Sequence, residues 1–227
     1  MNDPATNATQ RDLRYFALNK KHVRQYDTEF LSFAKASPQM SVLEIGCGTG
    51  IFSRYLLKKG FTDVVCLDLD KSLAPVLEDL GSFQVVFDDA ENYIASLPDD
   101  RKFDLIVMHD VLEHLPLEKS CSMLKAFHSV LSASGGVVIR VPNLSSPWGA
   151  RIFYGCFDHI TPFSPDRVRE LASLTAFQVA DMIGQKTGKR RKQIAFNMLN
   201  SFLSRILPEH PEIWEANIVA LLKKENT

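Results

Sequence analysis

Ser41-Val42-Leu43-Glu44-Ile45-Gly46-Cys47-Gly48-Thr49-Gly50 is the stretch of this chain that decides its fold. Val42, Leu43 and Ile45 supply the short apolar run of a buried parallel strand, and the three glycines permit a tight turn that side chains would obstruct. Apolar residues then recur at helical spacing up to a stop signal at Gly60. The sequence therefore predicts a strand, a glycine turn and a helix that together cradle a nucleotide-like ligand.

The spacing of the glycines argues against two common ligands. A dinucleotide-binding turn requires Gly-x-Gly-x-x-Gly, but Ile51 stands where the third glycine is needed. A phosphate-binding P-loop requires Lys-Ser/Thr after its last glycine, and Ile51-Phe52 occupies that place. The turn therefore suits a ligand without phosphate groups.

In this stretch the chain resembles the class I S-adenosylmethionine-dependent methyltransferases, whose first motif is similar to residues 42–50. The resemblance implies an α/β fold: a Rossmann-like, doubly wound, seven-stranded sheet, mostly parallel with an antiparallel last strand, and helices on both faces. It implies S-adenosylmethionine as the cofactor. Five residues of the motif are then expected to contact it, with Glu44 and the backbone of two glycines at its amino-acid end: Glu44, Gly46, Cys47, Gly48 and Gly50. Cys47 is expected to fill space in the turn rather than to act as a nucleophile.

Two further segments follow the motif order of that family. The apolar run 63–67 predicts a second strand that ends at Asp68, where an acid can accept hydrogen bonds from a ribose. The resemblance gives Asp68 this role and places Leu69 beside the cofactor. Residues 83–87 predict a third strand, and Asp89 with the Ala90 amide is expected to contact the adenine. Asp88 remains an alternative to Asp89.

The fourth predicted strand, 103–108, runs into His109-Asp110-Val111-Leu112-Glu113-His114. The resemblance places His109 and Asp110 beside the methyl donor, with His109 a candidate catalytic residue, and assigns Glu113 and His114 to bracing the next helix. A metal site is not expected, because His-x-x-x-Glu-His fits neither zincin spacing, His-Glu-x-x-His or His-x-x-Glu-His.

A fifth strand is predicted at 137–143, where Pro142 must end the ladder. Residues 144–161 are rich in aromatic residues and lack periodicity, which is typical of a substrate loop. His159 in this loop is a candidate general base, and a structural histidine bonded to Asp158 is the alternative. A helix at 165–175 and strands at 177–183 and 215–222 complete the pattern.

The chain is expected to form one domain, 13–227, after a disordered tail, 1–12. Its parts are a helical cap at 13–36, a cofactor-binding half at 40–143 and a substrate-side half at 144–227. Tyr15 and Tyr26 in the cap are minor substrate-site candidates. The substrate half contains a basic and amphipathic insertion, 186–207, in which residues 188–207 are candidates for weak contact with a membrane surface, a second subunit or the core.

Composition sets broad limits on function. The chain has 227 residues, of which 45% are hydrophobic, and a formal net charge of -1, so nucleic acid is not an expected partner. The four cysteines form no Cys-x-x-Cys pair and are expected to be reduced. The start of the sequence lacks the pattern of a secretory signal, and a cytoplasmic location is expected.

The expected activity is therefore methyl transfer to a small-molecule, glycan or lipid-type acceptor, with O-methylation favoured, by a monomer or homodimer. Transfer from a sulfonium is an in-line displacement that depends mainly on alignment and exclusion of water. Two alternatives remain: an NAD-dependent oxidoreductase, disfavoured by the glycine spacing, and a non-catalytic protein that binds S-adenosylmethionine.

Overall fold

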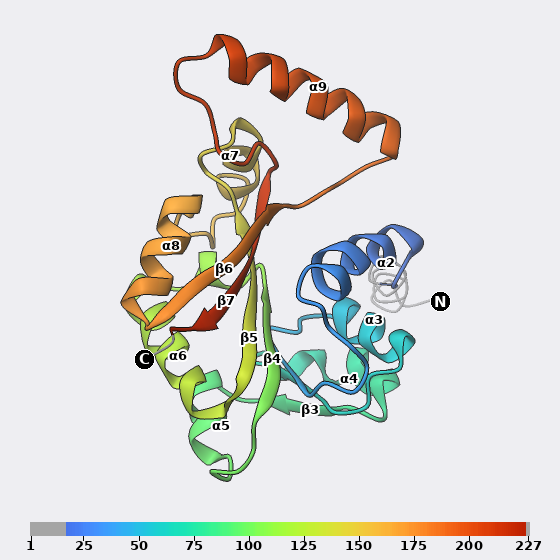
Figure 1. Ribbon diagram of the computed structural model, residues 1–227. Coiled ribbons are helices and arrows are strands. Elements are labelled where there is room, and N and C mark those ends of the chain that lie inside the picture. Colours follow the sequence, from blue (N-terminus) through green and yellow to red (C-terminus); the bar gives the residue numbers. More distant parts are fainter. Residues whose placement is uncertain (1–16, 226–227) are drawn as a thin grey trace, which may run out of the picture.

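The computed structural model describes residues 17–225, which contain one seven-stranded sheet with helices on both faces (Figure 1). The order of the strands is β3-β2-β1-β4-β5-β7-β6. Their bounds are β1 (Val42–Ile45), β2 (Val64–Asp68), β3 (Gln84–Phe87), β4 (Phe103–His109), β5 (Leu131–Pro142), β6 (Phe177–Gly184) and β7 (Asn217–Lys224). Tyr15 and the tail 1–12 lie outside the described residues.

The first five strands pair in parallel, whereas β7 lies antiparallel between β5 and β6. The predicted fold class is confirmed by this arrangement. The order of the strands reverses between β1 and β4, and in such sheets ligands bind outside the carboxyl ends of the strands at the point of reversal. The glycine turn that follows β1 lies at this point.

One face of the sheet is covered by the N-terminal helices. These are α2 (Lys20–Tyr26), the π-helical turn η1 (Asp27–Ser32) that continues it, α3 (Ile51–Lys59) and α4 (Ala74–Leu77) between the 3-10 turns η2 (Lys71–Leu73) and η3 (Glu78–Leu80). Their aromatic and aliphatic side chains pack against strand side chains on this face of the sheet. Together they form one hydrophobic cluster, which includes Phe30, Phe52 and Tyr55. The apolar side chains of the cap helix, residues 20–32, therefore pack in the hydrophobic core.

The opposite face is covered by α5 (Ala90–Ser96), α6 (Leu117–Val130) and α8 (Pro165–Leu174), which share a second cluster around Phe103, Phe127 and Phe177. The 3-10 turn η4 (Leu112–His114) connects β4 to α6. The two clusters together bury large side chains on both sides of every central strand. This burial is the main source of stability in such a domain.

Two segments differ from the pattern that the sequence predicts. The region 73–80 is broken into η2, α4 and η3, because Pro75 lies in the first turn of α4 and lacks the N–H that a longer helix needs. Within the unpatterned loop 144–161 the structure contains a helix, α7 (Pro147–Phe153), capped by the Ser146 side chain on the Trp148 N–H.

The insertion between β6 and β7 forms α9 (Arg190–Ile206), which extends away from the sheet at its upper end in Figure 1. The segment that contains α9 leaves the sheet after β6 and returns to it at β7. The two ends of this segment lie together, because the N–H of Gln185 donates to the carbonyl of Asn217 over 3.0 Å. Of the helices in residues 17–225, none combines the length and the apolar character that crossing a bilayer demands.

Candidate functional site

A small cavity of about 120 Å³ opens at the carboxyl ends of the strands. It brings together five residues that the sequence assigns to the cofactor, Gly46, Asp68, Leu69, Asp89 and Ala90, and also the alternative to Asp89, Asp88. Its remaining walls are mostly apolar and come from Ile45, Leu67, Val111, Leu115 and Met123, with Lys119 at the edge. A mostly apolar cavity bounded by carboxylates suits an adenosine group, whose rings are apolar and whose hydroxyls donate hydrogen bonds.

The glycine turn reaches this cavity only because its backbone is left-handed. Gly46, Gly48 and Gly50 have φ of 70°, 51° and 75°. At Gly46 there is also no space for a side chain, since a Cβ atom would lie 2.6 Å from Cγ2 of Val111. The turn is held to β2, because the N–H groups of Gly46 and Cys47 both donate to the carbonyl of Leu67.

Asp68 joins the end of β2 to the glycine turn. One carboxylate oxygen accepts from the N–H of Gly48 over 2.7 Å, and the other accepts from the N–H of Asp70 over 3.0 Å. Each oxygen of a carboxylate has two acceptor sites, so one on each oxygen remains after these bonds. The side chain lines the cavity with acceptor capacity for a diol.

Asp88 and Asp89 both line the cavity, and they are hydrogen-bonded in series. Asp89 caps α5 by accepting from the N–H of Glu91, and its own N–H donates to Asp88. Lys119 of α6 forms ion pairs with Asp89, at 3.1 Å, and with Glu91. These bonds, mainly to Lys119, hold the pKa of Asp89 below its usual value against the effect of burial.

Of the five motif residues expected at the cofactor, only Gly46 lines the cavity; Glu44, Cys47, Gly48 and Gly50 do not. Glu44 is buried below α3, where it accepts a 2.5 Å hydrogen bond from Ser53, and burial raises its pKa to about 8. Cys47 is also buried, and burial followed by the proximity of Glu44 raises the pKa of its thiol. A thiol with a raised pKa forms little thiolate at neutral pH, which disfavours a nucleophilic role.

His109 and Asp110 at the end of β4 lie under the N-terminal cap. The His109 ring stacks on Tyr26 with centroids 5.5 Å apart and meets the edge of Phe52 at 4.6 Å. Neither ring nitrogen has a hydrogen-bond partner among the described residues, and burial, with Arg140 nearby, lowers the pKa of His109 well below its ordinary value. His109 is therefore a neutral imidazole in an aromatic setting.

Arg140 of β5 is the central cation of this region, and sequence reasoning did not find it. Its Nε donates to Asp110 over 2.9 Å, a second guanidinium nitrogen pairs with the same carboxylate, and Nη1 lies 3.6 Å from Glu29 of the cap. Glu29 is almost completely buried and also accepts from Gln25 and Gln185. The sequence did contain a signal for this pairing: Arg140 is a charged residue within the apolar run 137–141, and such a residue is buried only when it is paired.

His159 lies on the other side of the turn after β4, beside His114. The two imidazole rings have centroids 4.6 Å apart, and His159 Nδ1 is 3.1 Å from the carbonyl oxygen of Phe153. The expected alternative, a bond from His159 to the Asp158 side chain, is not among the described hydrogen bonds; the carbonyl of Asp158 instead accepts from His114 over 3.2 Å. His159 and His109 are therefore not brought together.

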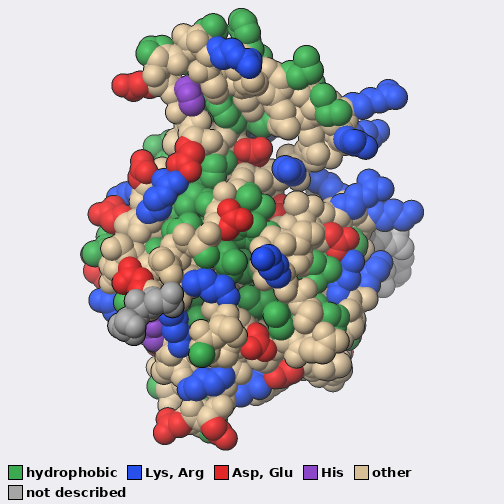
Figure 2. Space-filling model, in the orientation of Figure 1, with side chains coloured by type: hydrophobic (Ala, Val, Ile, Leu, Met, Phe, Trp, Pro, Cys, Tyr) green, Lys and Arg blue, Asp and Glu red, His purple; other side chains and the backbone are tan. Residues whose placement is uncertain are grey.

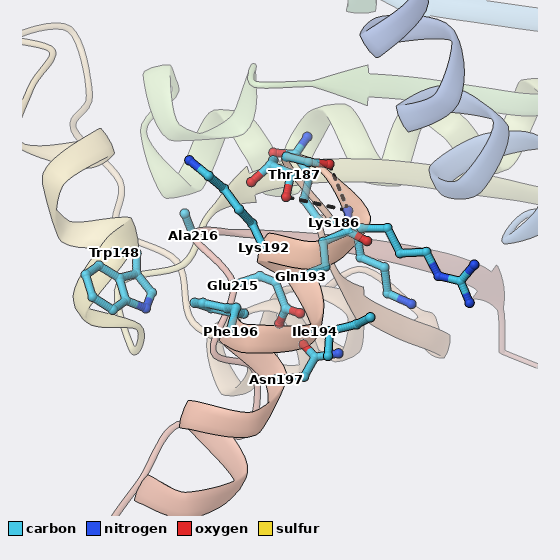
Figure 3. A pocket seen from close by; sticks show the side chains of 13 residues that line it. Trp148, Lys186, Thr187, Lys192, Gln193, Ile194, Phe196, Asn197, Glu215 and Ala216 are labelled. Carbon is cyan, nitrogen blue, oxygen red and sulfur yellow. Dashed lines mark hydrogen bonds between the residues drawn. The ribbon is translucent and has the colours of Figure 1, made fainter.

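A larger cavity of about 450 Å³ lies between α9 and the ends of β6 and β7 (Figure 3). Trp148 borders it on one side and Ile194 and Phe196 of α9 on another, with the rings of Trp148 and Phe196 6.4 Å apart. Lys192 and Glu215 add opposite charges to the lining. The arrangement is a mixed apolar and polar pocket on the side of the molecule predicted to bind substrate.

An adjoining cleft of about 750 Å³ separates the N-terminal end of α9 from α2. Lysine and arginine side chains gather there, as Figure 2 shows where α9 approaches the cap. Six cations line it, namely Lys20, Lys21, Arg24, Lys186, Lys189 and Arg190, and its lining contains no Asp or Glu. The two cavities share Lys186, Gly188, Arg190 and Gln193, so they form one continuous surface, hereafter the α9 cleft.

Comparisons with known proteins agree with this architecture. Residues 15–181 match the family model described as a methyltransferase domain. An uncharacterized methyltransferase of Alkaliphilus oremlandii is 31% identical over 119 residues, which are 51% of this chain and 53% of that protein. This chain therefore spans about half the length of that relative.

A ubiquinone biosynthesis O-methyltransferase of Aeromonas salmonicida is 29% identical over 191 residues, covering 74% of this chain and 77% of the relative. The crystal structure of a SAM-dependent methyltransferase from Archaeoglobus fulgidus aligns with a TM-score of 0.67 at 22% identity, over 98% of this chain and 100% of that one. At this identity the structural match shows a shared fold.

Proposed function

We propose that this chain, which belongs to the methyltransferase domain family, transfers a methyl group to a hydroxyl of a small acceptor that carries both a negative charge and an apolar part. S-adenosylmethionine is the methyl donor. The observation that carries the proposal for the acceptor is the α9 cleft, where six cations adjoin a pocket bordered by Trp148 and Phe196.

The donor half supplies positions for each part of the cofactor. Asp68, with a free acceptor site on each oxygen, binds the ribose hydroxyls, while Leu69 and Met123 flank the rings. Asp89, with Asp88 as the alternative, and the N–H of Ala90 bind the adenine. The left-handed turn at Gly46 and Gly48 receives the amino-acid end, because its backbone can approach a ligand closely where no Cβ intervenes.

The reaction is an in-line displacement, in which the acceptor oxygen attacks the methyl carbon and the sulfonium leaves as a neutral thioether. Most of the acceleration then comes from alignment of the two reactants in a site that excludes water. The attacking hydroxyl must lose its proton near the moment of transfer. We assign assistance with this proton to His159 rather than to His109, whose pKa is far below neutrality and whose ring is enclosed by Tyr26 and Phe52.

The charge of the acceptor follows from the cations of the α9 cleft. Within residues 17–225 none of the six takes part in an ion pair, so their field is not cancelled by neighbouring acids. A cleft lined by one sign of charge concentrates ligands of the opposite sign. The name of the Aeromonas relative, an O-methyltransferase, supports oxygen as the acceptor atom.

The experiment uses two acceptors with the same pair of hydroxyls, one of which carries an additional carboxylate group. With labelled S-adenosylmethionine, 3,4-dihydroxybenzoate should be methylated with a kcat/KM at least about tenfold above that of catechol, because its carboxylate meets the cations. The variant Lys21→Gln/Arg24→Gln/Arg190→Gln should lose this preference. Lys58→Gln/Lys59→Gln, which changes charges on α3, should retain it. Equal rates for both acceptors would contradict the assignment of an anionic acceptor.

The cofactor is tested separately by calorimetric titration with S-adenosylmethionine, S-adenosylhomocysteine and NAD. Binding of the two adenosyl ligands and not of NAD is expected. NAD binding alone would favour the oxidoreductase, and adenosyl binding without methyl transfer to any hydroxyl acceptor would favour a non-catalytic binding protein.

An exposed apolar stripe on α9, which begins at the edge of the pocket with Ile194, gives the chain a second candidate contact. Ile194, Met198, Phe202 and Ile206 are exposed and recur at helical spacing, beside the basic N-terminal end of the helix. We retain the prediction that this stripe makes weak contact with a membrane surface or a second subunit. Sedimentation with phosphatidylglycerol vesicles, against phosphatidylcholine vesicles as the neutral control, tests the first, and light scattering after gel filtration tests the second.

A further inference from the structure

Three side chains that can bind a metal ion converge beside the turn after β4. Glu113 and His114 belong to η4, and His159 lies in the segment between α7 and α8. Their ligand-type atoms all lie within 4.8 Å of one another. Hereafter these three residues are called the Glu113 cluster.

Backbone hydrogen bonds hold the two segments of the cluster together. The N–H groups of Ile160 and Thr161 both donate to the carbonyl of Glu113, over 2.8 Å and 3.1 Å. The Thr161 hydroxyl donates to the carbonyl of Leu115 over 2.6 Å. The approach of His159 to His114 is therefore fixed by the main chain rather than by contact between the side chains.

Both histidines place the same ring nitrogen, Nδ1, against a backbone carbonyl oxygen. His114 Nδ1 is 3.2 Å from the carbonyl oxygen of Asp158, and His159 Nδ1 is 3.1 Å from the carbonyl oxygen of Phe153. A carbonyl oxygen only accepts, so each Nδ1 is the donor, and Nε2 of the neutral ring then holds the lone pair that can bind a metal ion. Histidine ligands of metal ions are oriented by this kind of outer hydrogen bond.

The buried carboxylate of Glu113 is a second, independent observation that points to a bound ion. Its side chain is almost completely enclosed, with a relative exposure of 1%, and its Oε2 atom has no hydrogen-bond partner among the described residues. An enclosed carboxylate oxygen without a partner is destabilising, and such groups are normally paired or coordinate a metal ion. A cation bound between Glu113 and the two histidines would remove this cost.

We propose that Glu113, His114 and His159 bind a divalent transition-metal ion, with Zn²⁺ as the expected occupant. Two imidazole nitrogens and one carboxylate oxygen are a ligand set that suits zinc and related ions rather than calcium or magnesium. His114 is exposed and His159 is half-buried, so the ion is reached from solvent. Three protein ligands leave a fourth position for water or another oxygen ligand.

The site also deepens the role given to His159. Val111 and Leu115, which flank Glu113 and His114 in the chain, line the cofactor cavity. An acceptor hydroxyl bound at the fourth position would have its pKa lowered by the ion, so His159 would assist its deprotonation as a ligand rather than as the proton acceptor. This use of the ion rests on the proposed function, whereas the metal site does not.

The test measures metal binding without methyl transfer. Protein freed of metal with a chelator is titrated with Zn²⁺ by calorimetry, and with Co²⁺, whose visible absorption reports nitrogen and oxygen ligation. A single equivalent is expected to bind. His159→Ala, His114→Ala and Glu113→Gln should each weaken Zn²⁺ binding by roughly 100-fold or more, since each removes one of three ligands.

His210→Ala is the matched control, because His210 is an exposed histidine whose Nδ1 is likewise placed against a backbone carbonyl, that of Pro211, outside any such cluster. Its binding of Zn²⁺ should equal that of the wild type. Folding of every variant is checked by its affinity for S-adenosylhomocysteine, and Glu113→Asp, which keeps the carboxylate, replaces Glu113→Gln if that variant does not fold.

Wild-type protein that binds no Zn²⁺, or a His159→Ala variant that binds it as tightly as the His210→Ala control, would overturn the proposal. These outcomes are separate from failure of the proposed function. A protein that binds S-adenosylhomocysteine and methylates its acceptor without binding Zn²⁺ would refute the metal site alone.

Discussion

The carboxylate of Asp68 lies 2.7 Å from the backbone nitrogen of Gly48, so the end of β2 and the glycine turn after β1 are joined by a charge-assisted hydrogen bond. This bond fixes the side chain at the cavity before any ligand is present. The other carboxylate oxygen accepts from the N–H of Asp70. Each oxygen therefore keeps one acceptor site for the cofactor.

Replacing Asp68 with alanine should weaken binding of S-adenosylhomocysteine by roughly 10- to 100-fold, because hydrogen bonds to a charged group contribute about 1.5–3 kcal/mol. Asp68→Asn, which keeps one acceptor oxygen, should give an intermediate loss. Asp70→Ala, which removes only the exposed cap of η2, is the control and should bind normally. Calorimetry measures all three, and equal affinity of Asp68→Ala and wild type would refute the ribose assignment.

Gly46→Ala should destabilise the protein more than Gly48→Ala. Both substitutions force a side chain into left-handed backbone, at a cost of about 1–2 kcal/mol each. Only at Gly46 does the new Cβ also collide with Val111, whereas nothing lies within 4 Å of a Cβ at Gly48. Urea unfolding measures the difference, and the double variant Gly46→Ala/Val111→Ala should recover most of the excess. An unchanged excess in the double variant would mean that the collision is not its cause.

Stability should fall as the pH rises from about 5 to 8. Burial raises the pKa of Glu44 to about 8 from 4.5, so the folded protein retains a proton that the unfolded chain releases. Since the folded state then binds more protons, each rise in pH through this window favours unfolding, by up to about 1.4 kcal/mol per unit. Glu44→Gln should flatten the dependence in chemical unfolding at several pH values, and a slope identical to wild type would contradict the raised pKa.

Arg140→Met should cost about 3–5 kcal/mol of stability, because it leaves buried charge without its partner. The uncompensated group is mainly Glu29, which is almost completely enclosed, whereas Asp110 is half exposed and can be solvated. Glu29→Gln added to Arg140→Met should therefore restore part of the loss, and Asp110→Asn should restore less. Denaturant unfolding provides the measurement in two double-mutant cycles, one for Arg140 with Glu29 and one for Arg140 with Asp110. Strict additivity of the Arg140 and Glu29 effects would show that the two are not coupled.

The donor half could be predicted because its signals are local. Residues 42–60 contain the apolar run, the glycines and the helical spacing in direct succession, and the structure places β1, the turn and α3 there. The acids that end or follow β2 and β3 could be assigned because parallel strands in this fold present their carboxyl ends to one edge. Five residues that the sequence assigns to the cofactor, Gly46, Asp68, Leu69, Asp89 and Ala90, line one cavity.

The contacts around the cap and the segment 144–161 could not be predicted in the same way, because they join distant parts of the chain. Arg140 pairs with Glu29 of the cap. His159, which follows β5 in the chain, lies beside Glu113 and His114, which precede β5. The helix α7 was missed because Pro147 and Gly149 indicate a loop. Gly149 is required there for a tertiary reason: a Cβ atom would lie 1.8 Å from the carbonyl oxygen of Asn143. No local pattern encodes such a contact.

The hydrogen-bonded pair Gln185 and Asn217 closes the base of the excursion that carries α9, by a backbone bond and by a side-chain bond of 2.7 Å. A segment whose two ends meet at one point of a sheet can be shortened, lengthened or exchanged without altering the register of the strands that hold it. Residues 186–216 therefore form a replaceable module. Under the proposed function, exchange of this one module would change the acceptor that is methylated and leave the cofactor-binding half unaltered.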